Sequence, residues 1–170
     1  MENKLYYTKK AKYFEEALPI GNGRIGGLVF GNLKKERIAL NEDSLWSGYP
    51  KDLNKKDAGK HLDAVRDAVF SKNYSKAKDI LNKDMHGHWS EAYLPFGDLI
   101  IEYVNAPKKS YERTLELETG IAKVKTNGFC QTVFVSHPAQ LMVVNIHSDK
   151  GVSFKVSLDS QLHHRVETVE

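Results

Sequence analysis

The sequence predicts a mainly β protein, an antiparallel, supersandwich-like β-sandwich with a short helical insertion near residues 57–84. Apolar and polar residues alternate in several short runs, which is the pattern of strands with one buried face. Turn signals separate these runs at the short spacing that is typical of a sandwich. Because each strand keeps one polar face, the pattern excludes a buried parallel sheet.

The first zone, residues 5–50, mixes short apolar runs with glycine-rich turns. Residues 28–30 are apolar and lead into a Gly-Asn pair, which predicts a strand that ends in a turn. Residues 36–41 then alternate, with Ile38 and Leu40 on one side. This alternation predicts a half-buried strand.

The second zone, residues 57–84, has helical periodicity. Three apolar residues share one helical face, and Asp57 is a candidate N-cap. Asn73 interrupts the run, and a second short amphipathic stretch follows it. The shared apolar face consists of Leu62, Val65 and Val69. Nothing in these helices indicates chemistry.

The third zone, residues 93–158, contains one strand pattern after another. Residues 115–118 and 122–125 alternate between apolar and charged side chains. The Asn127-Gly128 pair then predicts a β-hairpin with a type I′ turn, in which both central residues have positive φ.

Further strand patterns cover residues 129–135 and 141–146, and Pro138 separates them because it cannot donate to a ladder. The apolar residues of the segment 152–158 all share one side. Residues 161–170 are polar and supply no closing strand. We therefore expect a sandwich that is truncated at its C-terminal end.

Composition and charge favour a folded globular domain over a nucleic-acid-binding or membrane-spanning protein. The chain has 170 residues, 41% hydrophobic and 28% charged, which is ordinary for a folded globular domain. Its net charge is +3, and acidic residues interleave with the lysines, so we expect no nucleic-acid partner. No apolar stretch is long enough to span a membrane, and the first twelve residues lack a signal-peptide core. We expect a cytoplasmic protein, unless a leader has been removed, and we expect no cofactor.

The run Gly21-Asn22-Gly23-Arg24-Ile25-Gly26-Gly27 matches the spacing G-x-G-x-x-G. A phosphate loop of this kind needs a strand before it and a helix after it. Here a strand pattern follows the glycines, and no Walker lysine and hydroxyl are present. The favoured interpretation is a glycine-rich turn at a strand, where the backbone approaches another surface closely.

The segment 41–48, Asn-Glu-Asp-Ser-Leu-Trp-Ser-Gly, is rich in functional groups. Carboxylates and amides bind sugar hydroxyls, and an indole ring stacks on a pyranose. Turn chemistry and a domain interface explain most of the same residues, and this is the leading interpretation. Glu42 and Asp43 are not a glycosidase acid/base pair, because neighbours on a strand point to opposite faces.

Histidine and cysteine positions suggest no metal site. His86 and His88 stand two residues apart, but no third and fourth ligands occur at defined spacing, so a loop is the better interpretation. The single cysteine, Cys130, lies in a strand pattern and reads as a small buried hydrophobe.

Several blocks, taken in order, resemble one family of enzymes. The run Glu-Ala-Leu-Pro-Ile-Gly-Asn-Gly-Arg-Ile-Gly at 16–26 and the run Ile-Ala-Leu-Asn-Glu-Asp-Ser-Leu-Trp-Ser-Gly at 38–48 are similar to signatures of glycoside hydrolase family 95. The helix with Val65-Arg66 and three later blocks follow in the family's order. Those blocks are Leu-Pro-Phe-Gly-Asp-Leu at 94–99, Tyr-Glu-Arg-Thr-Leu-Glu-Leu at 111–117 and Ser-His-Pro-Ala-Gln-Leu-Met-Val-Val at 136–144.

This resemblance implies an N-terminal β-sandwich domain, here partial over residues 1–170, in a larger multidomain enzyme. Such enzymes are inverting α-L-fucosidases that hydrolyse terminal, typically α-1,2-linked, fucosyl groups. The resemblance places the catalytic acid and base in a downstream α/α barrel, so no catalytic residue is carried over to this chain. The implied partners are that barrel and a fucosylated glycan.

Three alternatives remain open at this stage. The parent enzyme could be a related α-L-galactosidase, or another hydrolase or phosphorylase with the same domain type. The chain could also be a stand-alone carbohydrate-binding module that uses Trp46, Trp89 and Tyr93 as a platform. The residues predicted to meet substrate or a domain interface are Arg24, Asn41, Glu42, Asp43, Trp46 and Trp89.

Overall fold

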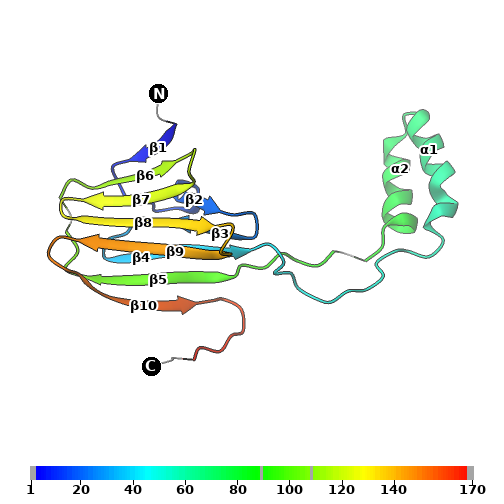
Figure 1. Ribbon diagram of the computed structural model, residues 1–170. Coiled ribbons are helices and arrows are strands. Elements are labelled where there is room, and N and C mark those ends of the chain that lie inside the picture. The colour runs from blue at the N-terminus through cyan, green and yellow to red at the C-terminus, as the bar shows by residue number, and fades with distance from the viewer. Residues whose placement is uncertain (1–2, 89, 108, 168–170) are drawn as a thin grey trace. The chain divides into compact units, whose positions relative to one another are not determined.

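The computed structural model describes residues 3–88, 90–107 and 109–167 (Figure 1). The chain divides into two compact units. The sandwich unit comprises residues 1–45 and 94–170, and the helical unit comprises residues 46–93. The predicted antiparallel sandwich with a helical insertion is confirmed.

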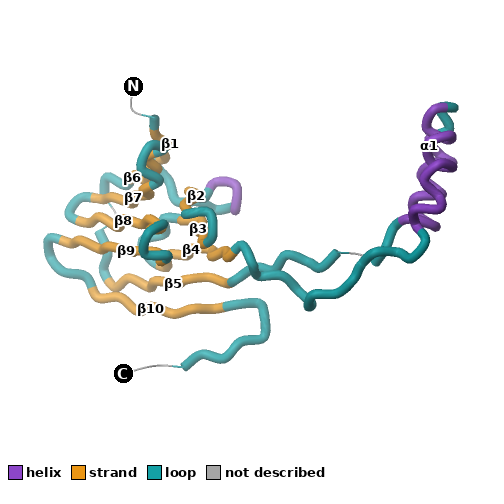
Figure 2. Tube along the Cα trace, turned by 45° about the vertical axis from the view of Figure 1, so that its right-hand side comes forward, coloured by secondary structure: helices purple, strands orange, loops and turns teal. Residues whose placement is uncertain are grey.

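The sandwich unit contains two five-stranded antiparallel sheets, whose strands and connecting loops are distinguished in Figure 2. One sheet has the order β1-β6-β7-β8-β9, and the other has the order β10-β5-β4-β3-β2. The first sheet comprises β1 (Lys4–Tyr7), β6 (Glu112–Glu116), β7 (Ile121–Thr126), β8 (Phe129–Ser136) and β9 (Leu141–Ser148). The second comprises β10 (Ser153–Asp159), β5 (Gly97–Val104), β4 (Lys35–Glu42), β3 (Ile25–Val29) and β2 (Leu18–Gly21). A short 3-10 helix, Phe14–Glu16, precedes β2.

The core of the sandwich unit is built from alternate residues of both sheets, as the sequence pattern predicts. Ile38 on β4 is fully buried, and its neighbours along the strand are more exposed. The buried apolar residues of this core include Leu18, Val29, Ile38 and Ile101 from one sheet and Leu115, Ala122, Val124, Phe129 and Val133 from the other. Burial of this apolar surface is the main stabilising term of the unit.

A polar network lies inside the same core. Glu36 on β4 is only 1% exposed and faces inward beside Ile38. Its carboxylate accepts hydrogen bonds from the amides of Gly31 (2.7 Å) and Arg37 (3.0 Å) and from Gln131 Nε2 (2.9 Å). The Tyr103 hydroxyl donates in turn to Gln131 Oε1. Burial raises the pKa of the Glu36 carboxyl, and the hydrogen bonds only partly offset that effect.

The hairpin between β7 and β8 has the predicted position but a different turn. Thr126 pairs with Phe129, so Asn127 and Gly128 form the two-residue loop. Gly128 has a φ of +80°, whereas Asn127 is not among the residues with positive φ. The expected type I′ turn, which needs positive φ at both positions, is therefore wrong.

The helical unit contains two short α-helices with flanking turns. These are a 3-10 turn (Ala58–His61), α1 (Leu62–Phe70), α2 (Tyr74–Ile80) and a π-helical turn (Leu81–Met85). The two α-helices pack on each other, and Ala68 and Ala77 are their buried residues. Among the described residues, no helix is long and apolar enough to cross a membrane.

Two polar residues flank these helices. Asn73 separates α1 from α2, as predicted, and its side chain caps α2 by accepting from the Lys76 amide. The expected capping by Asp57 is wrong. Asp57 precedes the 3-10 turn in a left-handed conformation, with a φ of +65°, and makes no side-chain cap. A left-handed residue cannot present its side chain as an N-cap does, because that role needs extended backbone.

Candidate functional site

Four of the predicted residues meet where β3 begins and β4 ends. The strand register pairs Ile25 with Glu42 and Gly26 with Asn41. The Arg24 Nε donates to Glu42 Oε1 at 3.1 Å, and the Asp43 amide donates to the Arg24 carbonyl at 3.0 Å. We call Arg24, Asn41, Glu42 and Asp43, together with Ser44, the strand-end cluster.

The carboxylate of Glu42 is held on both sides within the strand-end cluster. Its Oε2 accepts from the Ser44 amide at 3.0 Å and from the Ser44 hydroxyl at 2.7 Å, while Arg24 contacts Oε1. The hydrogen bond from the Ser44 hydroxyl, aided by Arg24, lowers the pKa of Glu42. A carboxyl held in its ionised form is poorly suited to donating a proton as a general acid. The turn interpretation of this segment thus accounts for its hydrogen bonds.

The glycine-rich run before the strand-end cluster is the turn between β2 and β3, as the sequence analysis favours. Asn22 closes it, since its Oδ1 accepts from the amides of Arg24 and Ile25 at 3.0 and 2.8 Å. Its Nδ2 donates to the Ser136 carbonyl at 3.0 Å, which ties the turn to the opposite sheet. A strand follows the glycines, so the context of a phosphate loop is missing.

The predicted close approach of the backbone occurs at Gly27. A Cβ at this position would lie 2.7 Å from the terminal methyl of Met142, which belongs to the opposite sheet. It would also lie 3.1 Å from a methyl of Ile38. A larger residue here would displace the end of the flexible Met142 side chain and press on Ile38, so packing between the sheets favours glycine and explains part of the motif without any ligand.

Trp46 belongs to the helical unit, where it pairs with Tyr93 at the opposite end of that segment. The two residues form an isolated antiparallel bridge, and their rings meet edge to face at 5.1 Å and 69°. Both rings are about half exposed. Because the rings are steeply inclined, they do not present one flat face of the kind that a sugar platform needs.

Polar contacts fasten the same two chain ends of the helical unit. The Ser47 amide donates to the Ala92 carbonyl at 2.8 Å, and the Ala92 amide donates to Ser47 Oγ at 2.9 Å. Ser47 Oγ donates to Glu91 Oε2 at 2.8 Å, and Lys51 pairs with the other oxygen of Glu91 at 2.5 Å. These contacts, with Lys51 first, lower the pKa of Glu91. The segment 46–93 thus begins and ends at one fastened point.

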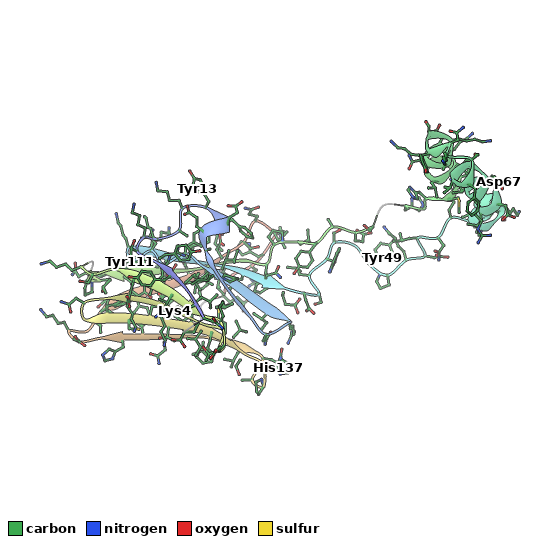
Figure 3. All side chains as sticks on the ribbon, turned by 90° about the horizontal axis from the view of Figure 1, so that it is seen from above. Lys4, Tyr13, Tyr49, Asp67, Tyr111 and His137 are labelled. Atoms are coloured by element: carbon green, nitrogen blue, oxygen red, sulfur yellow. The ribbon has the colours of Figure 1, made fainter. Side chains whose placement is uncertain are left out.

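A second candidate site, which the sequence analysis did not predict, is a pocket of about 1120 Å³ in the sandwich unit. It lies between β1, the loop that follows it, the turn before β4 and the start of β6. Figure 3 labels Tyr13 and Tyr111, which are two of its lining residues. The lining side chains are mainly tyrosines and lysines, with Arg113 beneath them. We call it the tyrosine–lysine pocket.

Sequence reasoning missed this pocket because its parts are far apart in the chain. Only the closely spaced lysines 9, 10 and 12 beside Tyr6 and Tyr7 gave a local signal. Lys34 and Arg113 join them through the strand pairing of β1 with β6 and through the turn before β4.

Comparison with known proteins identifies the domain. Residues 5–170 match the family described as glycosyl hydrolase family 65, N-terminal domain. The chain belongs to this family. The expectation of a glycoside hydrolase N-terminal β-sandwich domain is confirmed, and the narrower resemblance to family 95 stays a prediction.

Relatives of this glycosyl hydrolase N-terminal domain are named as fucosidases. The chain is 37% identical over 97% of its length to "Alpha-L-fucosidase 2" of Arabidopsis thaliana, and it covers 21% of that protein. It is 30% identical over 89% of its length to "Probable alpha-fucosidase A" of Aspergillus oryzae, and it covers 22% of that protein. The chain therefore spans about a fifth of the length of these relatives.

Two further predictions concern the loop after the helices of this domain. Trp89, predicted to meet substrate or an interface, lies outside the described residues. Within the described part of the chain, no group of three or more His, Cys, Asp and Glu side chains is placed to hold a metal ion.

Cys130 is half-buried on β8, and its Sγ lies 3.7 Å from the Thr132 hydroxyl.

Proposed function

We propose that this chain is the N-terminal, non-catalytic β-sandwich portion of a multidomain α-L-fucosidase of glycoside hydrolase family 95. The enzyme would hydrolyse terminal α-L-fucosyl groups, with α-1,2-linked groups as the preferred substrates, and would invert the anomeric carbon. The observation that carries the proposal is the 37% identity over 97% of this chain to a protein named "Alpha-L-fucosidase 2".

The contacts of Glu42 and the burial of Glu36 support the non-catalytic role. An inverting hydrolase needs an acid and a base about 6.5–9.5 Å apart on opposite sides of the scissile bond. Glu42 is engaged by Arg24 and Ser44, and its pKa is lowered, which disfavours the acid role. Glu36 is sealed in the core of the sandwich unit and cannot reach a glycan. We therefore assign both catalytic groups to a downstream α/α barrel.

The strand-end cluster is our proposed contact with that barrel or with the substrate. Arg24 keeps more than half of its side chain exposed while its Nε holds Glu42, so part of its guanidinium faces outward. Asn41 and Asp43 flank Glu42 at the same strand end. Trp46 and Trp89 are the remaining residues that we propose for an interface.

Trp46→Ala in the full-length enzyme should lower the melting temperature or the turnover. If both stay unchanged, the proposed role of Trp46 is refuted.

The activity is tested on the full-length protein that carries this chain. Its substrate is lactose bearing a terminal α-1,2-linked L-fucose, and the 170-residue chain alone is the matched control. We expect the full-length protein to release fucose and the chain alone to release none. Proton NMR during turnover should show β-L-fucose first, because inversion of an α-linkage yields the β anomer.

Three outcomes would contradict this proposal. Release of fucose by the 170-residue chain would refute its non-catalytic role. First appearance of the α anomer would refute inversion. Faster release from a terminal α-L-galactosyl analogue would assign the parent enzyme to the α-L-galactosidases, whose sugar differs by one hydroxyl group.

A further inference from the structure

The tyrosine–lysine pocket concentrates the positive charge of the chain. Its lining includes five cationic residues and a single acidic one, Glu16. The chain has 25 Lys and Arg and 22 Asp and Glu, which leaves 20 cationic and 21 acidic side chains elsewhere. The excess positive charge of the whole chain is thus gathered at this pocket. The cationic lining residues are Lys9, Lys10, Lys12, Lys34 and Arg113.

Arg113 gives the pocket a fixed positive charge beneath its wall. Its side chain is almost fully buried, and its guanidinium donates to the carbonyls of Lys9 and Glu16 at 2.9 and 2.8 Å. The guanidinium also lies 4.6 Å from the centre of the Tyr7 ring. Among the described residues, no carboxylate lies within ion-pair distance of Arg113. Neutral carbonyls and a ring orient the charge, and the Glu16 carboxylate, whose pKa Arg113 helps to lower, offsets it only in part, so a positive field reaches the pocket.

The one acidic lining residue is already engaged. Glu16 Oε2 accepts from the Lys12 amide at 2.7 Å, which is the largest cause of the lowered pKa of this carboxyl. The carboxylate therefore stays ionised and bound to its own loop. The four lysines around it all lack a side-chain hydrogen bond or ion pair among the described contacts. An anion in this pocket would meet several unpaired ammonium groups.

Two tyrosines supply apolar faces beside these charges. Tyr6 and Tyr13 are 53% and 66% exposed, and neither ring has an aromatic or cationic partner in the described structure. Tyr111 is different, because its hydroxyl donates to the Gly31 carbonyl at 2.7 Å and burial raises its pKa. Free rings beside cations suit a ligand with both an apolar face and an anionic group, which a sugar ring with an acidic substituent provides.

We propose that the tyrosine–lysine pocket binds an acidic saccharide, a short oligosaccharide that carries a carboxylate or a sulfate. Lys10 and Lys34 bind the anionic group, and Tyr13 stacks on a sugar ring. The volume of about 1120 Å³ slightly exceeds the roughly 300–1,000 Å³ of typical small-molecule pockets, so it accommodates more than one sugar ring. The proposal does not depend on the fucosidase activity, and it would stand if the fucosidase proposal failed.

The test is isothermal titration calorimetry on the full-length protein. The probes are trigalacturonate for the carboxylate and 6-O-sulfated galactotriose for the sulfate, with neutral galactotriose and triglutamate peptide as controls. We expect saturable binding of at least one acidic sugar, and none of either control. Affinity should fall when NaCl is raised from about 0.05 to about 0.5 M, because the lysines are exposed and their charges are screened.

Charge variants locate the binding at the pocket. The double variant Lys10→Gln/Lys34→Gln should weaken it roughly tenfold, the factor for about 1.4 kcal/mol. Lys78→Gln/Lys150→Gln removes the same charge from other surfaces and should leave the affinity unchanged. Among the described contacts, none of these four side chains makes a hydrogen bond or ion pair, so we expect both double variants to fold.

Ring variants test the sugar part of the ligand. Tyr13→Ala should weaken binding of trigalacturonate, whereas Tyr74→Ala, at the same 66% exposure on α2, should not. The proposal is overturned if neither acidic sugar gives saturable heat, or if triglutamate binds equally well. It is also overturned if the control lysine variant weakens binding as much as the pocket variant. Loss of fucosidase activity alone would leave these results unchanged.

Discussion

Replacing Glu36 by alanine should destabilise the sandwich unit strongly, although Glu36 is a charged residue inside an apolar core. The substitution leaves four buried or partly buried donors without their acceptor, the amides of Gly31, Asn32 and Arg37 and the Nε2 of Gln131. An unsatisfied buried donor costs about 1–3 kcal/mol, so the free energy of unfolding should fall by at least about 3 kcal/mol. That is a large part of the roughly 5–15 kcal/mol of a typical domain.

Glu36→Gln is the matched variant, because it keeps the volume and one acceptor oxygen. If the side-chain amide of Gln131 rotates, its oxygen can accept from the side-chain NH2 of the new glutamine. The Gln131 NH2 group then faces Tyr103, whose hydroxyl changes from donor to acceptor. We expect Glu36→Gln to cost clearly less than Glu36→Ala at pH 7. Urea unfolding of the chain, followed by far-UV circular dichroism, measures both. An alanine variant within about 1 kcal/mol of the wild type would refute the role of this network.

The difference in stability between the wild type and Glu36→Gln should depend on pH in a definite direction. Burial raises the pKa of Glu36 in the folded state, so the folded protein binds the proton more tightly than the unfolded chain. Between the ordinary glutamate pKa of about 4.3 and the raised value, the wild type should lose stability relative to Glu36→Gln as the pH rises. Above that window the difference should be constant. A wild type that gains stability over this window would show that the hydrogen bonds outweigh burial.

Three further substitutions test other contacts by urea unfolding or hydrogen exchange. Gly31→Ala forces a Cβ against the Tyr111 hydroxyl at a φ of +77° and should cost about 2 kcal/mol or more. An equal loss in Gly120→Ala, where φ is +65° and the space is open, would contradict the packing argument. Asn22→Ala removes three hydrogen bonds of the β2–β3 turn and should cost about 1–2 kcal/mol, whereas an unchanged urea midpoint would show that the turn does not need them. Ala77→Leu overfills the contact between α1 and α2 and should speed amide exchange in α1, and unaltered exchange would show a loose contact.

Strand and helix positions could be predicted because they depend on local patterns. The alternation around Ile38 places a strand with a buried face, and the structure has β4 there with Ile38 in the core. The Asn127-Gly128 pair placed a hairpin correctly. Its turn type was wrong because the local preference for positive φ at asparagine is weak, and Asn127 takes negative φ in this hairpin.

Buried polar residues could not be predicted in the same way. Alternation puts Glu36 on the same side as Ile38, but polarity alone gives no reason to bury a carboxylate. Burial becomes possible because Gln131, 95 residues away on the other sheet, donates to it. Arg113 is a similar case, since its acceptors are the backbone carbonyls of Lys9 and Glu16. Contacts of this kind depend on the three-dimensional pairing of the sheets and leave no local pattern.

Of the two candidate sites, one depends on local sequence and could be predicted, whereas the other depends on distant contacts and could not. The strand-end cluster could be predicted from sequence because Arg24 directly precedes β3 and Glu42 ends β4, and these two strands form one hairpin. Its role remains a proposal, since the hydrogen bonds of Glu42 to Arg24 and Ser44 are also what a well-formed turn requires. The tyrosine–lysine pocket gave almost no signal in the sequence, although it contains the less satisfied set of charged groups.

The buried network and the tyrosine–lysine pocket are joined at one residue, Gly31. The amide of Gly31 donates to Glu36 in the core, and its carbonyl accepts from Tyr111 in the pocket wall. A glycine is needed there, because a Cβ would meet both Tyr111 and the side chain of Arg113. The pocket wall is therefore held in place before any ligand arrives, which reduces the ordering cost of binding. It follows that loss of the Glu36 carboxylate should loosen the pocket, even though Glu36 does not line it.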